Sequence, residues 1–176
     1  IEALLITTYP DTIETINSRM FPALHVRWWL ARSEDESRVL NIGDTGTYKT
    51  SFAALSVLQA GCQQTLVFCA PGARDNWENE LKIYFPWARR PGAVHVIRGI
   101  RDIAFIPNNA RFVVVGYSNL TRPEIVGALS KLTFDGVIWD ECQYGKNVLG
   151  KSAAQRATAC LKIMKEAAAR LKKTLA

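Results

Sequence analysis

Short apolar runs alternate with amphipathic stretches along most of this chain. The runs are rich in Val, Ile, Leu and Phe, the composition of buried β-strands. Between them, apolar residues recur at helical spacing. Strands that alternate with helices usually form a mostly parallel central sheet with helices on both faces, so the pattern predicts an α/β fold. The predicted strands lie near residues 39–42, 65–70, 93–97, 111–117 and 134–139.

One predicted helix has a well-defined apolar stripe. In the amphipathic stretch after the second apolar run, Trp77, Leu81 and Tyr84 recur at i, i+4 and i+7. This spacing places them on one face of a helix, which we expect to pack on the sheet with Trp77 in the core. Glu78 and Lys82 on the same helix are spaced for an i,i+4 ion pair.

A glycine-containing loop follows the first apolar run and leads into a helical pattern over residues 51–59. Strand, loop and helix in this order are the context that a phosphate-binding Walker A loop requires. In such a loop, backbone N–H groups surround phosphate oxygens, a Lys reaches the β- and γ-phosphates, and a Thr binds magnesium. The sequence therefore predicts ATP and Mg²⁺ as cofactors, with the binding residues Gly43, Asp44, Thr45, Gly46, Thr47, Tyr48, Lys49 and Thr50.

Tyr48 stands where the Walker A pattern has a glycine. A side chain at this position restricts the backbone and crowds the path of the phosphates. We therefore expect weaker nucleotide binding than in a loop with glycine. The same residue supports an alternative hypothesis, in which the chain is a non-hydrolysing nucleic-acid-binding or assembly module with a degenerate P-loop.

Two adjacent carboxylates, Asp140 and Glu141, end the last apolar run. A carboxylate at the end of a buried strand can hold magnesium, directly or through water, while its neighbour accepts a proton from the attacking water. Taken alone, such a pair is more often the start of a solvated turn. Together with Lys49 and Thr50, it predicts a Walker B element.

Three further segments occur in an order typical of Swi/Snf-type, helicase-related ATPases of superfamily 2. Residues 66–72 end an apolar strand in a proline-containing loop, and the next helix has Trp77 followed three residues later by Glu80. Residues 113–120 resemble the family's strand that carries a Tyr before the next helix. Residues 140–147 resemble its DEAH box with the trailing Lys-Asn.

The resemblance covers residues 38–176 and implies the first RecA-like lobe of an ATP-dependent DNA translocase or helicase. A second motor lobe is expected elsewhere in the full protein, and residues 1–37 are expected to form a helical segment that leads into the lobe. Double-stranded DNA is the implied partner. An upstream Gln motif for adenine, which the family has, is not found in this sequence.

The resemblance also implies roles for individual residues. Lys49 and Glu141 would be catalytic, and Thr50 and Asp140 would bind the metal. Gln143, where the family usually has His, would couple the nucleotide to the DNA-facing side. Nucleic-acid contacts are implied in the loops after the second and fourth strands, at Pro71, Gly72, Arg74, Tyr117 and Ser118.

Charge agrees with a polyanionic partner without identifying it. The formal net charge is +6, and basic residues bind phosphates with little dependence on sequence. Part of this charge lies in a final helix predicted from residue 152 onward, whose basic residues we expect to face solvent. Its predicted apolar face consists of Ala157, Leu161, Met164, Ala168, Leu171 and Leu175.

Other classes of protein are disfavoured. The chain has no run of 18 apolar residues, which excludes a transmembrane helix, and its first residues do not resemble a signal peptide. We therefore expect an intracellular protein, cytoplasmic or nuclear, with no membrane partner. The spacing of Cys62, Cys69, Cys142 and Cys160 predicts neither zinc nor disulfides, and Cys69 and Cys142 are expected to be buried. A small-molecule kinase stays a further alternative, against which residues 71–80 and 140–147 argue.

Overall fold

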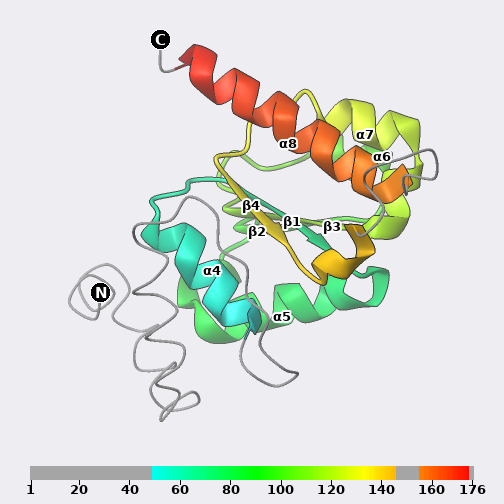
Figure 1. Ribbon diagram of the computed structural model, residues 1–176. Coiled ribbons are helices and arrows are strands. Elements are labelled where there is room, and N and C mark those ends of the chain that lie inside the picture. Colours follow the sequence, from blue (N-terminus) through cyan, green and yellow to red (C-terminus); the bar gives the residue numbers. More distant parts are fainter. Residues whose placement is uncertain (1–48, 146–154, 175–176) are drawn as a thin grey trace.

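The described part of the chain forms an α/β fold around a parallel sheet (Figure 1). A computed structural model describes residues 49–145 and 155–174. Four strands, all parallel to their neighbours, lie in the order β2-β3-β1-β4. They confirm four of the predicted strands, and the one expected near residues 39–42 lies outside the described residues. The strands are β1 (Thr65–Cys69), β2 (Val94–Ile97), β3 (Phe112–Gly116) and β4 (Gly136–Trp139).

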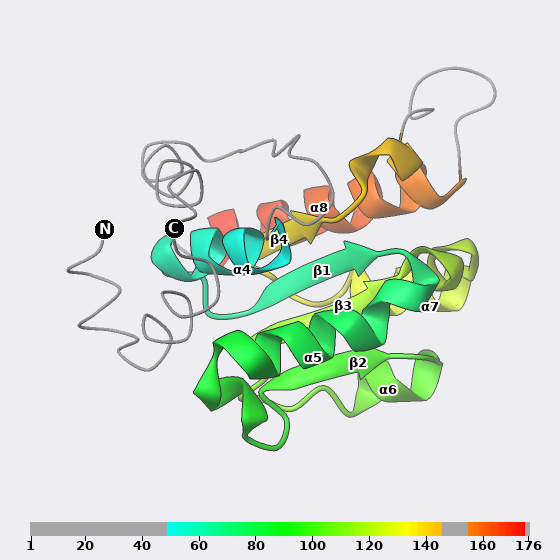
Figure 2. The ribbon, with the colours of Figure 1, turned by 90° about the horizontal axis from the view of Figure 1, so that it is seen from below.

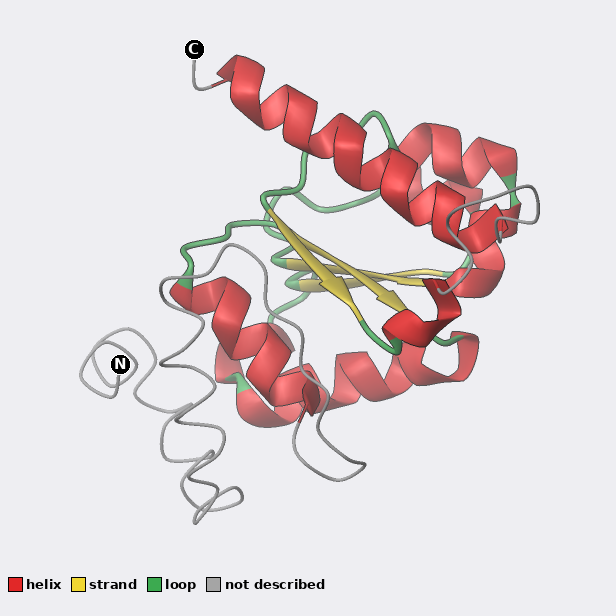
Figure 3. Ribbon diagram, viewed as in Figure 1, coloured by secondary structure: helices red, strands yellow, loops and turns green. Residues whose placement is uncertain are grey.

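Helices cover both faces of this sheet, as predicted (Figures 1 and 3). One face carries α4 (Lys49–Gln59) and α5 (Arg74–Tyr84). The other carries α6 (Ile100–Ala104), α7 (Pro123–Leu129) and α8 (Gln155–Thr174). Short 3₁₀ turns follow the strands or helices at η1 (Pro71–Ala73), η2 (Pro86–Arg89), η3 (Tyr117–Thr121) and η4 (Cys142–Gly145).

Two apolar layers form because successive strand residues point to opposite faces of the sheet. In β1, Val67 and Cys69 belong to the layer under α4 and α5, whereas Leu66 and Phe68 belong to the layer under α6, α7 and α8. Every residue of β1 and of β3 is buried. Strands buried on both faces require continuous apolar sequence, which explains why these two read as uninterrupted apolar runs.

The apolar stripe of α5 is confirmed. Trp77, Leu81 and Tyr84 are at most 9% exposed and belong to the layer between α5 and the sheet. Lys82 Nζ lies 2.6 Å from Glu78 Oε1, so the predicted i,i+4 pair also forms.

For α8, the predicted apolar face is partly wrong. Of the predicted residues, Ala157 is buried, Leu161 and Met164 are half-buried and Ala168 is exposed, whereas Cys160, Ile163 and Ala167 are also buried. Toward the end of the helix, the face predicted from spacing is rotated by about one residue from the face that is buried. The buried face is decided by packing against the apolar layer that covers β1 and β3, which spacing does not reveal. Arg170 is half-buried, and its guanidinium donates to the carbonyls of Ser130 and Leu132.

Two other expectations can be compared with the described residues. Cys69 is buried, as predicted, but Cys142 is exposed, so that prediction is wrong. Among the helices described, none combines the length and the apolar character needed to cross a bilayer.

We predict that Gly136→Ala lowers the free energy of unfolding by about 1–3 kcal/mol through overpacking. A Cβ at Gly136 would lie 2.6 Å from Thr65 Oγ1 and 3.1 Å from Cys62 Sγ. Gly127, in α7, is the matched control because a Cβ there meets no atom within 4 Å. Gly127→Ala should be stabilising by about 0.5–1 kcal/mol, since alanine favours the helix. Urea unfolding measures both, and equal effects would contradict the packing at the start of β4.

Candidate functional site

The carboxyl-terminal edge of the sheet brings together predicted site residues that are distant in sequence. In parallel strands all carboxyl ends lie at the same edge, which is where α/β folds commonly bind ligands. Here β1 is followed by Pro71–Ala73, β3 by Tyr117–Thr121 and β4 by Asp140 and Glu141. Helix α4, which begins at Lys49, packs beside β4 (Figure 2). We call this group of segments the carboxyl-edge site.

Asp140 is the most constrained residue of the carboxyl-edge site. It follows β4 directly, and its N–H donates to the carbonyl of Phe68 at 2.9 Å. The indole Nε1–H of Trp77 donates to its Oδ2 at 3.0 Å. The hydroxyl of Tyr117 donates to its main-chain carbonyl. The main chain and the side chain of Asp140 are thus both held by hydrogen bonds.

The charge state of Asp140 reflects competing effects. Burial raises the pKa of its carboxyl group, the hydrogen bond from Trp77 lowers it, and the negative charge of Glu141 raises it. The positive charge of Lys49 also lowers the pKa of Asp140.

Lys49 and Thr50 are the first two described residues of α4, and both are half-buried. In the sequence they directly follow the glycine-containing loop, and a helix N-terminus after such a loop favours a bound anion through its backbone N–H groups and its dipole. The other predicted cofactor-binding residues, Gly43, Asp44, Thr45, Gly46, Thr47 and Tyr48, lie outside the described residues.

Glu141 has an unusual backbone conformation. Its φ is 52°, the left-handed region that residues with a Cβ seldom adopt. The side chain is exposed, and Gln143 Nε2 donates to its Oε2. A residue held in this region costs on the order of 1–3 kcal/mol, so the surrounding contacts must fix the turn after β4. The turn leaves the Glu141 carboxylate accessible beside the constrained Asp140.

The residues predicted to contact nucleic acid differ in their surroundings. Pro71, Gly72 and Ser118 are exposed at the carboxyl edge. Arg74 is half-buried, and its guanidinium donates to the carbonyls of Pro71 and Ile97. Tyr117 is only 1% exposed. The phenol is buried in the core and bonded to Asp140, so the exposed side chain of this turn is that of Ser118, and nucleic-acid contact at Tyr117 stays a prediction.

The role of Trp77 was only half predicted. Its apolar spacing placed it in the core, where it is 3% exposed. Its hydrogen bond to Asp140 was not predicted, although a buried indole N–H commonly has a partner. Sequence does not specify that partner, because α5 and the end of β4 meet only through the pairing of β4 with β1.

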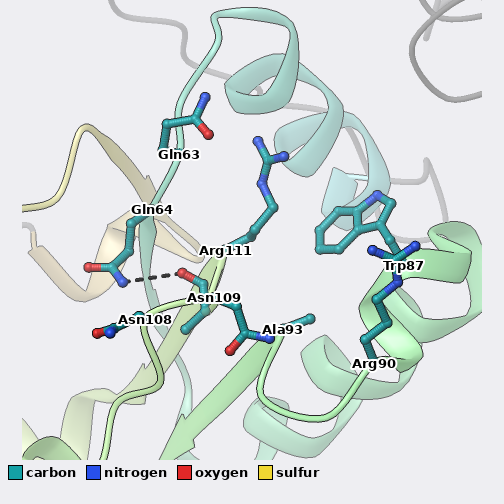
Figure 4. Close-up of a pocket in the computed structure, with 9 residues that line it drawn as sticks. Gln63, Gln64, Trp87, Arg90, Ala93, Asn108, Asn109 and Arg111 are labelled. Atoms are coloured by element: carbon teal, nitrogen blue, oxygen red, sulfur yellow. Dashed lines mark hydrogen bonds between the residues drawn. The ribbon is translucent and has the colours of Figure 1, made fainter.

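A separate cavity of about 410 Å³ lies at the opposite, amino-terminal edge of the sheet (Figure 4). It is lined by residues that precede β1, β2 and β3, including Gln64, Ala93 and Arg111, and by none of the predicted site residues described. Arg111 donates to the carbonyl of Cys62 at 2.9 Å and lies over the ring of Trp87. Because these contacts hold the guanidinium in the fold, the cavity is not the candidate site.

Comparisons with protein-family models, with curated proteins and with solved structures found no match to this chain. The function must therefore be inferred from the geometry and chemistry of the carboxyl-edge site itself.

The raised pKa of Asp140 gives a prediction about stability and pH. A carboxyl group with a higher pKa in the folded state binds protons more readily there, so it makes the folded state lose stability as the pH rises through that pKa. Asp140→Asn keeps an acceptor for Trp77 but does not titrate. In metal-free buffer at neutral pH the variant should be more stable than the parent, by about 0.5–2 kcal/mol.

Below about pH 3, where the Asp140 carboxyl group is protonated in the unfolded chain as well, the two proteins should be equally stable. Urea unfolding at several pH values measures the difference. Asp75→Asn is the control, because Asp75 forms an ion pair in which both side chains are more than half exposed. Its effect should stay within about 0.5 kcal/mol. A parent more stable than Asp140→Asn at neutral pH would contradict the stated balance of charges.

Proposed function

We propose that this chain is a RecA-like P-loop lobe that binds ATP and magnesium at the carboxyl-edge site. One observation carries the proposal: α4, whose described residues begin with Lys49 and Thr50, packs beside β4, which Asp140 directly follows. A phosphate-binding Lys at a helix N-terminus beside a magnesium-binding Asp at a strand end is the arrangement that P-loop NTPases use.

The donor set fits magnesium in the manner expected for a nucleotide site. Mg²⁺ is usually held by one or two carboxylates together with substrate phosphates, not by a cage of protein ligands. Within residues 49–145 and 155–174, no group of three or more His, Cys, Asp or Glu side chains is placed to hold a metal ion. Asp140, with Thr50 on the first turn of α4, is the set that would hold it.

Each residue then has a defined task. Lys49 binds the β- and γ-phosphates, and the magnesium ion, when bound, neutralises charge that develops on the phosphates. Glu141, exposed in the turn after β4, orients water and accepts its proton. Gln143, which donates to Glu141, links this turn to the DNA-facing side.

We further propose that the lobe belongs to a Swi/Snf-type, ATP-dependent motor on double-stranded DNA. The net charge of +6 suits a polyanion. The exposed turns after β1 and β3, at Pro71, Gly72 and Ser118, lie at the same edge as the nucleotide site, where DNA contact and nucleotide state can be coupled. The second lobe of such a motor supplies arginine side chains to the transferred phosphate, so this lobe alone should hydrolyse ATP very slowly.

The second candidate function is a non-hydrolysing nucleic-acid-binding or assembly module. Tyr48 favours it, because a side chain in the loop restricts the approach of phosphates. Nucleotide affinity separates the two candidates.

Lys49→Ala tests the nucleotide site. Loss of a charge-assisted hydrogen bond to phosphate costs about 1.5–3 kcal/mol, so the affinity for ATP with magnesium should fall about 10-fold to 150-fold. Lys131→Ala is the control, because Lys131 is exposed in the turn after α7. Isothermal titration calorimetry measures both. Equal affinity in Lys49→Ala and the parent, or a parent that binds no ATP, would support the module instead.

Ser118→Asp tests the proposed nucleic-acid face. A negative charge in the exposed turn after β3 should weaken binding to duplex DNA at least about threefold at low salt, because backbone phosphates dominate the interaction. Thr133→Asp, an exposed position at the amino-terminal edge, should have little effect. Fluorescence anisotropy with two unrelated duplexes at low and moderate salt measures both variants. Binding that is insensitive to salt, or equally weakened by both substitutions, would refute this face.

A further inference from the structure

We propose that Trp77 and Tyr117 are positioning residues that hold Asp140 in the orientation needed for magnesium-dependent nucleotide binding, a role that presupposes the nucleotide site proposed above. Neither side chain would touch the nucleotide. Each acts through a hydrogen bond to Asp140, one on the carboxylate and one on the main chain.

Asp140 lies just beyond the end of the pairing between β1 and β4. The last pair in the register between β1 and β4 is Phe68 with Trp139, so Asp140 is one residue beyond the ladder. Glu141 then turns into the left-handed region, with φ 52°. A residue between the end of a strand and a strained turn needs other contacts to fix it, and the N–H of Asp140 has one in the carbonyl of Phe68.

Trp77 fixes the side chain. Its indole Nε1–H donates to Asp140 Oδ2 at 3.0 Å, and the ring is buried between α5 and the sheet. Such burial leaves the indole little freedom to move, so the hydrogen bond selects one orientation of the carboxylate. Two oxygens offer about four acceptor sites; Trp77 occupies one of them, and the backbone N–H of Glu141 also bonds to this carboxylate. The other sites stay available to a metal ion or its water.

Tyr117 fixes the main chain. Its hydroxyl donates to the carbonyl of Asp140 and, at 3.4 Å, lies within reach of the carbonyl of Phe68. The phenol is 1% exposed, and a phenol keeps its proton at neutral pH. A permanent donor at this point holds the end of β4 against the end of β1.

The hydrogen bond of Trp77 is not explained by burial alone. Trp87 and Trp139 each have a buried indole Nε1 without a hydrogen-bond partner among the described residues. This fold therefore tolerates an unpaired indole N–H at two other positions. At position 77, by contrast, the indole N–H donates to the partly buried Asp140 carboxylate. A Phe at this position would fill the apolar layer without placing a polar N–H group in it.

The two positioning residues are also close in sequence to the exposed turns of the carboxyl edge. Trp77 lies in the first turns of α5, directly after Pro71–Ala73, and Tyr117 begins η3, whose next residue is the exposed Ser118. A ligand that shifts either turn would act on Asp140 through one intervening side chain. The positioning pair thus gives a physical route between the proposed nucleic-acid face and the nucleotide site.

The experiment compares Trp77→Phe with Trp87→Phe. The two variants undergo the same chemical change in the same apolar layer, but only Trp77 loses a hydrogen bond. Calorimetry measures ATP affinity with magnesium and with EDTA. Loss of a supporting partner typically weakens metal binding about 10-fold to 100-fold. Trp77→Phe should therefore reduce the magnesium-dependent gain in affinity about 10-fold or more and leave the affinity in EDTA unchanged, whereas Trp87→Phe should change neither.

Tyr117→Phe should reduce the same gain, and Asp140→Ala should move the indole Nε1–H resonance of Trp77 in NMR spectra without moving that of Trp87. If the parent binds ATP and Trp77→Phe keeps the full gain from magnesium, the positioning role is refuted while the proposed function stands. If the parent binds no ATP, the proposed function fails instead. Circular dichroism of each variant confirms that it is folded.

Discussion

Because β1 pairs in parallel with both β3 and β4, the segments that follow these strands all emerge at one edge of the sheet. The carboxyl-edge site depends on this arrangement. It places Asp140 one residue beyond Phe68, within reach of Trp77 from α5 and Tyr117 from η3. A slip of one residue between β1 and β4 would point the side chains of β4 to the wrong face and separate Asp140 from these partners.

Polar groups at this edge are held by apolar packing. Trp77 and Tyr117 belong to opposite apolar layers, one on each face of the sheet, and both donate to Asp140 at the end of β4. The cores of the two layers thus converge on a single acidic residue. This arrangement keeps a carboxylate partly buried, at a cost in solvation that its hydrogen bonds offset only in part, since the pKa of Asp140 remains raised.

The two edges of the sheet differ in what their polar residues do. At the amino-terminal edge, Arg111 and Asp135 satisfy backbone groups of the segment 62–64 that leads into β1. At the carboxyl-terminal edge, Glu141 and Ser118 are exposed, and the Asp140 carboxylate is only partly buried. Polar groups that complete the fold and polar groups that remain available to a ligand are thus separated, which is the division expected when function is placed on loops of a rigid scaffold.

The sequence by itself determined the strands and helices of the described residues and indicated a candidate site. Continuous apolar runs can be buried on both faces of a sheet, so residues 65–70 and 111–117 had to be central strands, and the spacing of Trp77, Leu81 and Tyr84 had to face them. Only the tertiary structure decided which contacts form between segments that are distant in sequence. Periodicity does not encode which neighbour a helix meets, so it misplaced the buried face of α8. Nor does it show that Tyr117 points inward to Asp140, or that Trp77 donates to that carboxylate, because these contacts exist only once the order and register of the strands are set.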